Sequence, residues 1–291
     1  MTGNEIARAL ERIRQENRQG ATALTRDAVK LVIEALQKGA DRESLAQIAV
    51  ALAGARPMMA SVFDFANRLL FWLDEVPRES LETLCRRYLR QMEEANRLAI
   101  GRAMELMRPY RTAVIHSASS MVAELLERLH EEGHSMRLFC TESRPAREGL
   151  SMGRRLCEAG MDVTLVVDAA AGLAMREADL FLIGADGIGV EGVVHKVGTY
   201  PMALAAREEG VELLCLATTM KIWPKERGPL TEPAKPPEEI GATGCLGGMN
   251  RYFDMTPLHL FTNIVTEAGV ERGADVGIRC GSLPLHQRLR S

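Results

Sequence analysis

Apolar residues recur at three- and four-residue intervals through the first third of the chain, which is the spacing of amphipathic helices. One such helix is predicted to begin near Ala21. Its apolar face consists of Leu24, Ala28, Leu31, Val32 and Ala35. Turn signals interrupt the pattern at residues 18–21, 38–40, 54–57 and 76–77. Residues 1–108 are therefore predicted to form a helical N-terminal domain.

Beyond Thr112 the pattern changes to short apolar runs that alternate with amphipathic segments. The runs predict strands at Thr112–His116, Met136–Thr141, Asp162–Val167, Leu180–Gly184 and Leu213–Ala217. The segments between them predict helices at Ser120–Glu132, Glu148–Glu158, Ala170–Glu177 and Tyr200–Glu209. Such alternation is typical of a parallel sheet with helices on its faces. The predicted fold class is therefore α/β, with a Rossmann-like parallel-sheet C-terminal domain over residues 109–291.

The last quarter of the chain is predicted to hold a long loop and one more helix. The stretch Ile222–Asn250 is rich in Pro and Gly, which favours an irregular loop. The residues Asp254–Pro257 then predict the start of a last helix, with Thr256 as its cap and Pro257 at its first position.

The predicted strand Leu180–Gly184 leads directly to Asp186. In open α/β folds, ligands bind in the crevice outside the carboxyl ends of the strands, so this carboxylate is a candidate for chemistry. The residues that follow predict a flexible loop because three of them are glycine: Gly187, Gly189 and Gly192. This loop would bring His195 and Lys196 into the same neighbourhood. The alternative is that Asp186 only begins a turn, since Asp followed by Gly is a common turn signal.

Polar residues follow other predicted strands as well. His116–Ser120 places small hydroxylated residues at a strand-to-helix turn, which is a ready site for an anion. The alternative is that Ser119 or Ser120 simply caps the helix. The next strand leads to Arg144 and the third to Asp168, and the alternative for Arg144 is a solvated surface side chain. Because these polar groups share one edge of the sheet, the pattern favours a binding site there.

Composition narrows the function classes. The 291 residues include 36 Lys and Arg against 39 Asp and Glu, so no global basic field favours nucleic acid or an anionic membrane. Six cysteines occur singly, with no C-x-x-C pair, which predicts neither zinc nor a disulfide framework and indicates a reducing compartment. No run approaches the roughly eighteen apolar residues of a membrane span. A cytoplasmic protein without membrane contact or direct nucleic-acid binding is therefore expected.

Several of these segments together resemble a known family. The stretch IGADGIGVEGVVHKVGTY at 183–200 is similar to the G-A-D and N-K-x-G-T motif of one particular family. That family unites the alpha, beta and delta subunits of translation initiation factor 2B with methylthioribose-1-phosphate isomerase and ribose-1,5-bisphosphate isomerase. Supporting matches are TESRP at 141–145, the Arg18-x-Gly20-Ala21 turn, Ala55-Arg56-Pro57 and FDMTPLHLFTNIVTEAGV at 253–270. The resemblance implies a helical domain packed on a Rossmann-like domain, a homodimer or higher homo-oligomer, and a pocket for a small-molecule sugar phosphate, with no cofactor or metal.

The resemblance also assigns residues. The isomerase members hold phosphate with two arginines, which are matched here by Arg18 and Arg56. The family's catalytic aspartate falls on Asp186, and its Asn-Lys pair falls on His195 and Lys196. The implied catalytic positions are Asp186 and Ser117. The implied substrate-binding positions are Arg18, Gly20, Arg56, His116, Ser119, Arg144, Glu148, His195 and Lys196.

Two positions depart from the family pattern. Ser117 stands at the catalytic cysteine of the family's T-H-C-N-S turn, and a hydroxyl is a far weaker acid and base than a thiol. Glu148 stands where the ribose bisphosphate isomerases have the glutamine of R-P-x-x-Q-G. A carboxylate there would repel a phosphate if it pointed inward.

Two function classes therefore stay open. The first is a protein that binds a sugar phosphate or nucleotide monophosphate, as suits the regulatory subunits of initiation factor 2B, whose H-G-Y-S turn also lacks the cysteine. The second is an isomerase that converts an aldose 1-phosphate to a 2-ketose 1-phosphate without a metal. The missing thiol favours binding, or an altered isomerase, over the standard enzyme. A subunit that contacts a translation GTPase is a further alternative, without support of its own in the sequence.

Overall fold

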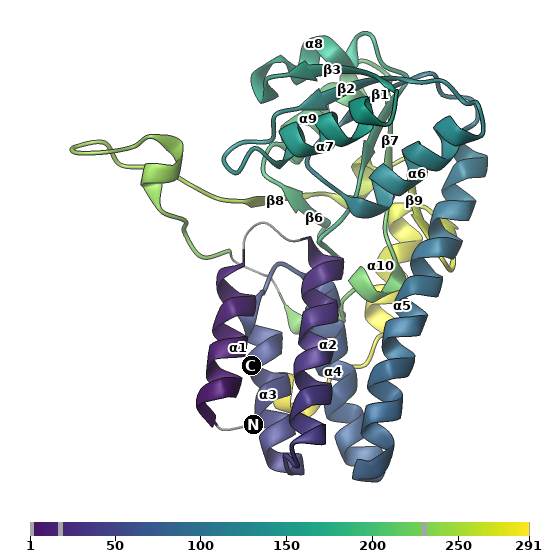
Figure 1. Cartoon of the computed structure of the whole chain (residues 1–291). Helices are drawn as coiled ribbons and strands as arrows, with labels where there is room; N and C mark the ends of the chain where they lie inside the picture. The colour runs from purple at the N-terminus through teal and green to yellow at the C-terminus, as the bar shows by residue number, and fades with distance from the viewer. Residues whose placement is uncertain (1–2, 17–19, 229–231, 291) are drawn as a thin grey trace.

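The computed structural model describes residues 3–16, 20–228 and 232–290. Helices gather at one end of the molecule and a helix-covered sheet lies at the other (Figure 1). The helices of the first part are α1 (Gly3–Gln15), α2 (Ala21–Gln37), α3 (Arg42–Ala55), α4 (Ala60–Glu75) and α5 (Arg78–Met107). The predicted α/β class is confirmed.

The helical part folds around the apolar stripes of its helices. Its centre is formed by side chains at most 1% exposed, including Leu24, Leu45, Leu52, Phe65 and Tyr88. Burying an aliphatic or aromatic side chain of this size stabilises a fold by roughly 1.5–3 kcal/mol. The period of the sequence pattern therefore indicated the correct buried faces.

Helix α5 runs along both parts of the molecule (Figure 1). Its first half contributes Leu81 and Tyr88 to the helical core, and its second half contributes Ile100 and Met107 to the core beneath the sheet. One continuous helix therefore fixes the helical part relative to the sheet. The expected domain boundary at residue 108 falls just beyond its end and stays a prediction.

The main sheet has seven strands in the order β10-β9-β7-β4-β1-β2-β3. Their bounds are β1 Thr112–Ile115, β2 Arg137–Thr141, β3 Asp162–Val166, β4 Leu180–Ile183, β7 Glu212–Leu216, β9 Asn263–Thr266 and β10 Gly269–Glu271. All neighbours are parallel except β9 and β10, which are antiparallel. The five predicted strands are confirmed, and β9 and β10 extend the sheet beyond them.

Helices cover both faces of this sheet. On one face, α6 (Ser120–Glu131) and α7 (Glu148–Glu158) share an apolar core with the end of α5. On the other face lie α8 (Ala171–Met175), α9 (Thr199–Glu208) and α10 (Gly273–Ser282). Single 3-10 turns occur at Asp168–Ala170, Thr219–Lys221, Lys225–Arg227, Pro237–Ile240, Leu258–Leu260 and Gln287–Leu289.

A second, antiparallel sheet contradicts the predicted helix start at Asp254–Pro257. It consists of β5 (Gly187–Ile188), β6 (Val193–Lys196) and β8 (Phe253–Thr256). Thr256 is buried opposite Val193 in β6 instead of capping a helix. The cap-like Thr-Pro signal is local, whereas the pairing of β8 with β6 satisfies its backbone groups through a distant segment. The following helix, α10, begins only at Gly273.

The glycines after Asp186 form a tight hairpin, so the expected flexible loop is wrong. The N–H of Gly189 donates to the carbonyl of Gly192 at 2.9 Å, which closes the turn between β5 and β6. A Cβ added to Gly187 would lie 1.7 Å from the Trp223 ring, and one added to Gly189 would lie 2.3 Å from it. These glycines therefore make room for the indole.

Two segments late in the chain leave the sheet. The described residues of the stretch Ile222–Asn250 contain no α-helix or named strand, as predicted, and much of this stretch extends away from the body of the protein (Figure 1). The final residues return to the helical part, where the Asn67 side chain binds the backbone of Pro284 and His286. Among the described helices, none combines the length and hydropathy needed to cross a membrane.

Candidate active site

A chain of hydrogen bonds fixes the turn after β1. The Nε2 of buried His116 lies 3.1 Å from the carbonyl of Val197, and its Nδ1 lies 2.6 Å from the Thr141 hydroxyl. Burial lowers the pKa of His116, so its ring is neutral, with the proton on Nε2, and Nδ1 accepts from Thr141. The Ser143 hydroxyl lies 3.1 Å from that of Thr141 and accepts the N–H of Ser117 at 2.8 Å. His116 therefore positions Ser117 from within the fold.

Two serines in this region have left-handed backbone conformations. The φ angles are 68° at Ser117 and 62° at Ser143. Such angles are uncommon for residues other than glycine and persist where the surroundings impose them. The Asp168 carboxylate accepts the N–H groups of Ser143 and Arg144 at 2.7 and 2.6 Å. Asp168 thus holds the turn that follows β2 in place.

Ser117, Glu148 and Lys196 meet at one carboxylate oxygen. The Ser117 hydroxyl donates to Oε1 of Glu148 at 2.9 Å, and the Lys196 ammonium lies 2.6 Å from the same oxygen. The Lys196 side chain is only 6% exposed. The other oxygen of Glu148, Oε2, is buried and has no hydrogen-bond partner among the described residues. Glu148 therefore points into the site, where it pairs with Lys196.

Asp186 lies where the sheet, the hairpin and the helical part come together. Its N–H donates to the carbonyl of Val194 in β6 at 2.9 Å. Its carbonyl accepts the N–H of Ala60, at the start of α4, at 2.8 Å. The residue is therefore fixed at the junction between the two parts of the molecule.

The Asp186 carboxyl titrates close to neutral pH. Burial raises its pKa to about 6, while the positive charges of Lys221, Lys196 and Arg56 oppose that rise and Glu148 adds to it. A carboxyl with such a pKa takes up and releases protons readily near pH 7. The predicted catalytic position thus has the protonation behaviour that acid–base chemistry needs.

Lys221 is a site residue that the sequence reasoning missed. It is 7% exposed, burial lowers its pKa, and among the described residues its ammonium has neither a hydrogen bond nor an ion pair within contact distance. Its charge is the strongest attraction that acts on Asp186. The available signal was position, because Lys221 lies just beyond the predicted strand Leu213–Ala217, at the edge that carries Asp186.

Arg56 brings a cation from the helical part. It follows α3, is 8% exposed, and its guanidinium donates to the carbonyl of Arg14 at 3.0 Å. Burial lowers its pKa, and the charge of Asp186 acts against that shift. A cavity of about 400 Å³ adjoins it, lined by Arg14, Gly54, Ala55, Arg56, Pro57, Met58, Met59, Glu232, Pro233, Lys235 and Phe253. Arg56 therefore adds a positive charge from the helical part that acts on Asp186.

Comparison with known proteins shows to which family the chain belongs. The model of the Initiation factor 2 subunit family matches residues 14–272. The chain belongs to this family.

Individual members show how far the likeness extends. A ribose 1,5-bisphosphate isomerase of Archaeoglobus fulgidus is 31% identical, over 91% of this chain and 89% of that protein. The crystal structure of the Pyrococcus horikoshii OT3 translation initiation factor eIF-2B superposes with a TM-score of 0.79 at 28% identity, over 91% of this chain and 96% of that one. The tetrameric eIF2B-beta2-delta2 complex from C. thermophilum shares the fold, with a TM-score of 0.74 at 15% identity and coverage of 94% and 92%.

The other positions that the resemblance implied differ from one another in burial and in their contacts. Arg18 lies outside the described residues. Gly20 is exposed and precedes α2, where its carbonyl accepts the first helical N–H groups. The Ser119 hydroxyl accepts the N–H of Val122, so it caps α6 as the alternative interpretation proposed. Arg144 is half-buried, and its guanidinium has no partner among the described residues.

His195 takes the place of the family's asparagine as a buried, neutral imidazole. Burial lowers its pKa well below the usual range, and the neighbouring His116 adds to that effect. The Thr199 hydroxyl donates to the carbonyl of Lys196 at 2.6 Å. It therefore accepts from Nδ1 of His195 at 2.9 Å, which leaves Nε2 unprotonated.

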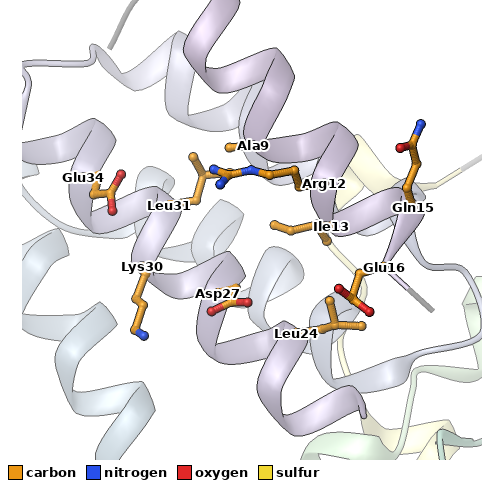
Figure 2. Close-up of a pocket in the computed structure, with 10 residues that line it drawn as sticks. All are labelled: Ala9, Arg12, Ile13, Gln15, Glu16, Leu24, Asp27, Lys30, Leu31 and Glu34. Carbon is orange, nitrogen blue, oxygen red and sulfur yellow. The ribbon is translucent and has the colours of Figure 1, made fainter. Parts of the chain in front are cut away.

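A separate cavity lies between α1 and α2, away from the strand ends (Figure 2). Its volume is about 490 Å³. Figure 2 shows that Arg12 extends from α1 toward Leu31 of α2, while Asp27 and Lys30 point in different directions. Both signs of charge line this cavity, so it offers no concentrated field to an anion. Among the described residues, no group of three or more His, Cys, Asp or Glu has the arrangement of a metal site.

Proposed function

We propose that this protein binds a pentose 1-phosphate at the carboxyl edge of its sheet and converts it to the 2-ketose 1-phosphate. The observation that carries the proposal is the Asp186 carboxyl, with a pKa of about 6, among the cations Lys221, Lys196 and Arg56. Cations and a proton-transferring group in one place suit a substrate that is both an anion and a proton donor. The membership of sugar-phosphate isomerases in the family supports this assignment.

The charges of the site favour a single phosphate group. Lys196 is already paired with Glu148, which leaves Lys221 as the buried lysine without an ion-pair partner among the described residues. A buried charge is costly unless it is paired. We infer that the phosphate of the ligand lies between Lys221 and Arg56, with Arg144 near its outer side.

The roles follow from the chemistry of a sugar 1-phosphate. Ring opening needs a proton on the departing ring oxygen, and formation of the ketone needs removal of a proton from the hydroxyl on carbon two. Asp186 in its protonated form supplies the first proton, and its carboxylate takes the second. A pKa close to the working pH serves both steps.

A protein that binds the sugar phosphate without turnover is the second candidate. The observation that favours it is Ser117, a hydroxyl at the family's cysteine position, already bound to Glu148. The sheet fold is also shared with a tetrameric initiation-factor complex. A homo-oligomer in which each chain keeps its own site is consistent with either candidate.

Phosphorus NMR separates the two candidates. Wild type is expected to convert ribose 1-phosphate or methylthioribose 1-phosphate to a new phosphomonoester signal, and Asp186→Asn is expected to abolish the conversion. Binding without any new signal would leave the second candidate. If calorimetry detects no binding of these compounds or of ribose 1,5-bisphosphate, both candidates are wrong.

Removal of the phosphate-binding cations tests the location of the site. Lys221→Ala and Arg56→Ala are each expected to weaken binding by about 2 kcal/mol, because hydrogen bonds to charged groups contribute more than neutral ones. Inorganic phosphate should compete with the sugar phosphate. Arg176→Ala is the control, since Arg176 pairs with Glu209 at the surface and its loss should not change the affinity. Unchanged affinity in both test variants would place the anion elsewhere.

A further inference from the structure

The carboxylate of Glu148 lies directly against the Ser117 side chain. Its Oε1 accepts from the Ser117 hydroxyl and pairs with Lys196, while Oε2 is buried and has no partner among the described residues. A buried carboxylate oxygen without a donor is uncommon in a folded protein and calls for an explanation. Here the unpaired oxygen lies on the same residue that pairs with Lys196 and acts on Asp186.

The backbone beneath Glu148 allows little movement. Gly149 follows it, and a Cβ there would lie 1.9 Å from the carbonyl oxygen of Thr141 and 2.7 Å from the Ser143 hydroxyl. The start of α7 is therefore packed directly on the turn that Asp168 holds. Together with the two contacts to Oε1, this packing fixes the direction of the carboxyl group. A catalytic base must be held in this way to be effective.

Ser117 cannot replace a thiol as the base. Its hydroxyl proton is directed to Glu148, and a serine hydroxyl gives up that proton far less readily than a cysteine does. In this hydrogen bond Ser117 is the donor and the Glu148 carboxylate is the acceptor, so the carboxylate is the group that can take up a proton. Ser117 is a positioning residue that orients the carboxylate.

We propose that Glu148 is the base that moves the proton between carbons two and one of the substrate, in place of a cysteine. This assignment rests on the proposed isomerase function and names the residue that makes it possible without a thiol. Two carboxyl groups then share the reaction. Asp186 transfers protons to and from the oxygen atoms of the substrate, and Glu148 transfers the proton between its carbon atoms.

The proton and electron balance closes over two steps. In the first, Glu148 takes the proton of carbon two, the C2–H electrons form the C1=C2 bond, and the bond from carbon one to the ring oxygen breaks. The ring oxygen takes the proton of Asp186, which gives an open-chain enol with its phosphate still on carbon one. In the second, Asp186 takes the proton of the hydroxyl on carbon two, the ketone forms, and carbon one receives the proton from Glu148. Both carboxyl groups end in their starting states, and no oxidant or reductant is needed.

His195 is the alternative base at this edge. Its Nε2 is unprotonated, but its ring is buried and is fixed by the hydrogen bond between Nδ1 and the Thr199 hydroxyl. The carboxylate of Glu148 adjoins Ser117 itself, so the structure favours Glu148. His195→Asn, which places the family's residue at this position, distinguishes the two.

The test follows turnover of a pentose 1-phosphate by phosphorus NMR and binding by calorimetry, in the full-length protein. Glu148→Gln is expected to lower kcat by at least a hundredfold while the ligand still binds, and this loss should exceed the loss in His195→Asn by at least tenfold. Glu142→Gln is the matched control, because Glu142 lies at the same edge and pairs only loosely with Arg147, at 3.7 Å. The double variant Ser117→Cys with Glu148→Gln supplies a thiol and is expected to recover turnover over Glu148→Gln alone.

The outcomes separate this inference from the proposed function. Turnover in Glu148→Gln at the wild-type rate would overturn the role of Glu148 and leave the isomerase intact. Absence of turnover in wild type with every pentose 1-phosphate, while binding persists, would overturn both the isomerase and its base.

Discussion

The interior of helices α2 to α5 and the carboxyl edge of the sheet both exclude water, but they bury different side chains. The helical interior holds aliphatic and aromatic groups such as Leu52 and Phe65. The sheet edge buries two neutral imidazoles and two lysines beside the partly buried Asp186, and neither Lys221 nor Asp186 has a direct ion pair among the described residues. The first kind of burial stabilises the fold, and the second kind costs stability.

A cavity in the helical interior should have the largest effect on stability. Leu52→Ala is expected to lower the free energy of unfolding by about 2–5 kcal/mol, because Leu52 is fully buried and its loss leaves a void. Val50→Ala in the same helix is the control, since Val50 is 40% exposed and should cost no more than about 0.5 kcal/mol. Urea denaturation at one protein concentration measures both. Equal losses would show that α3 does not pack as described.

Removal of the Asp186 charge should raise the free energy of unfolding, whereas the cavity at Leu52 lowers it. Burial raises the pKa of Asp186 to about 6, so the folded state binds a proton more tightly than the unfolded state does. Stability should therefore fall as pH rises from about 4 to 6, and the full cost should be present above pH 6. At pH 7.5, Asp186→Asn is expected to stabilise the protein by up to about 3 kcal/mol, as two pKa units correspond to that energy.

The pH dependence of the Asp186→Asn effect is the sharper measurement. The advantage of the variant over wild type should shrink as the pH falls below 6 and vanish below about pH 4, where Asp186 is protonated in both states. Denaturation curves at pH 4, 5, 6 and 7.5 show this trend. A variant that is less stable than wild type at pH 7.5 would mean that the Asp186 carboxylate holds the site together.

Two helical glycines distinguish close packing from free space. Gly149→Ala is expected to lower stability by about 1–3 kcal/mol, because the new Cβ would lie 1.9 Å from the carbonyl of Thr141. Gly101→Ala in α5 meets no atom within 4 Å and should raise stability by about 0.4–1 kcal/mol. Thermal unfolding of the two variants should shift in opposite directions. A stabilising Gly149→Ala would show that α7 does not rest on the turn after β2.

A surface carboxylate gives the smallest effect, with a pH dependence opposite to that of Asp186. Asp41 caps α3 by accepting the N–H of Ser44 at 2.8 Å, and its hydrogen bonds with Ser44 lower its pKa. Its contribution should therefore be complete above pH 4 and be lost as the pH falls. Asp41→Ala is expected to lose a small part of the stability at pH 7 and less at pH 3. Identical losses at both values would show that the cap does not depend on charge.

The parts of the site that the sequence indicated are those that stand at strand ends. Asp186 and Ser117 follow predicted strands, and local patterns were enough to predict them at one edge, whereas Lys196 was expected on a flexible loop and instead ends β6. Lys221 follows a correctly predicted strand, but its burial depends on how the 3-10 turn folds back toward Asp186. Glu148 was assigned from a motif, while its direction was left open. Contacts with Ser117 and Lys196 decided that direction.

The helical part and five of the parallel strands could be predicted from the sequence, because periods of 3.6 and short apolar runs report local geometry and burial. The strand at Asp254–Thr256, by contrast, depends on a long-range contact, since its backbone pairs with β6, a segment far away along the chain. The same holds for the glycines beside Trp223, where an indole from a later segment fills the space that a Cβ would need. It also holds for the pKa of Asp186, because burial and charges from separate elements set that value. Properties of neighbours in sequence are readable from the chain, whereas properties of neighbours in space require the fold.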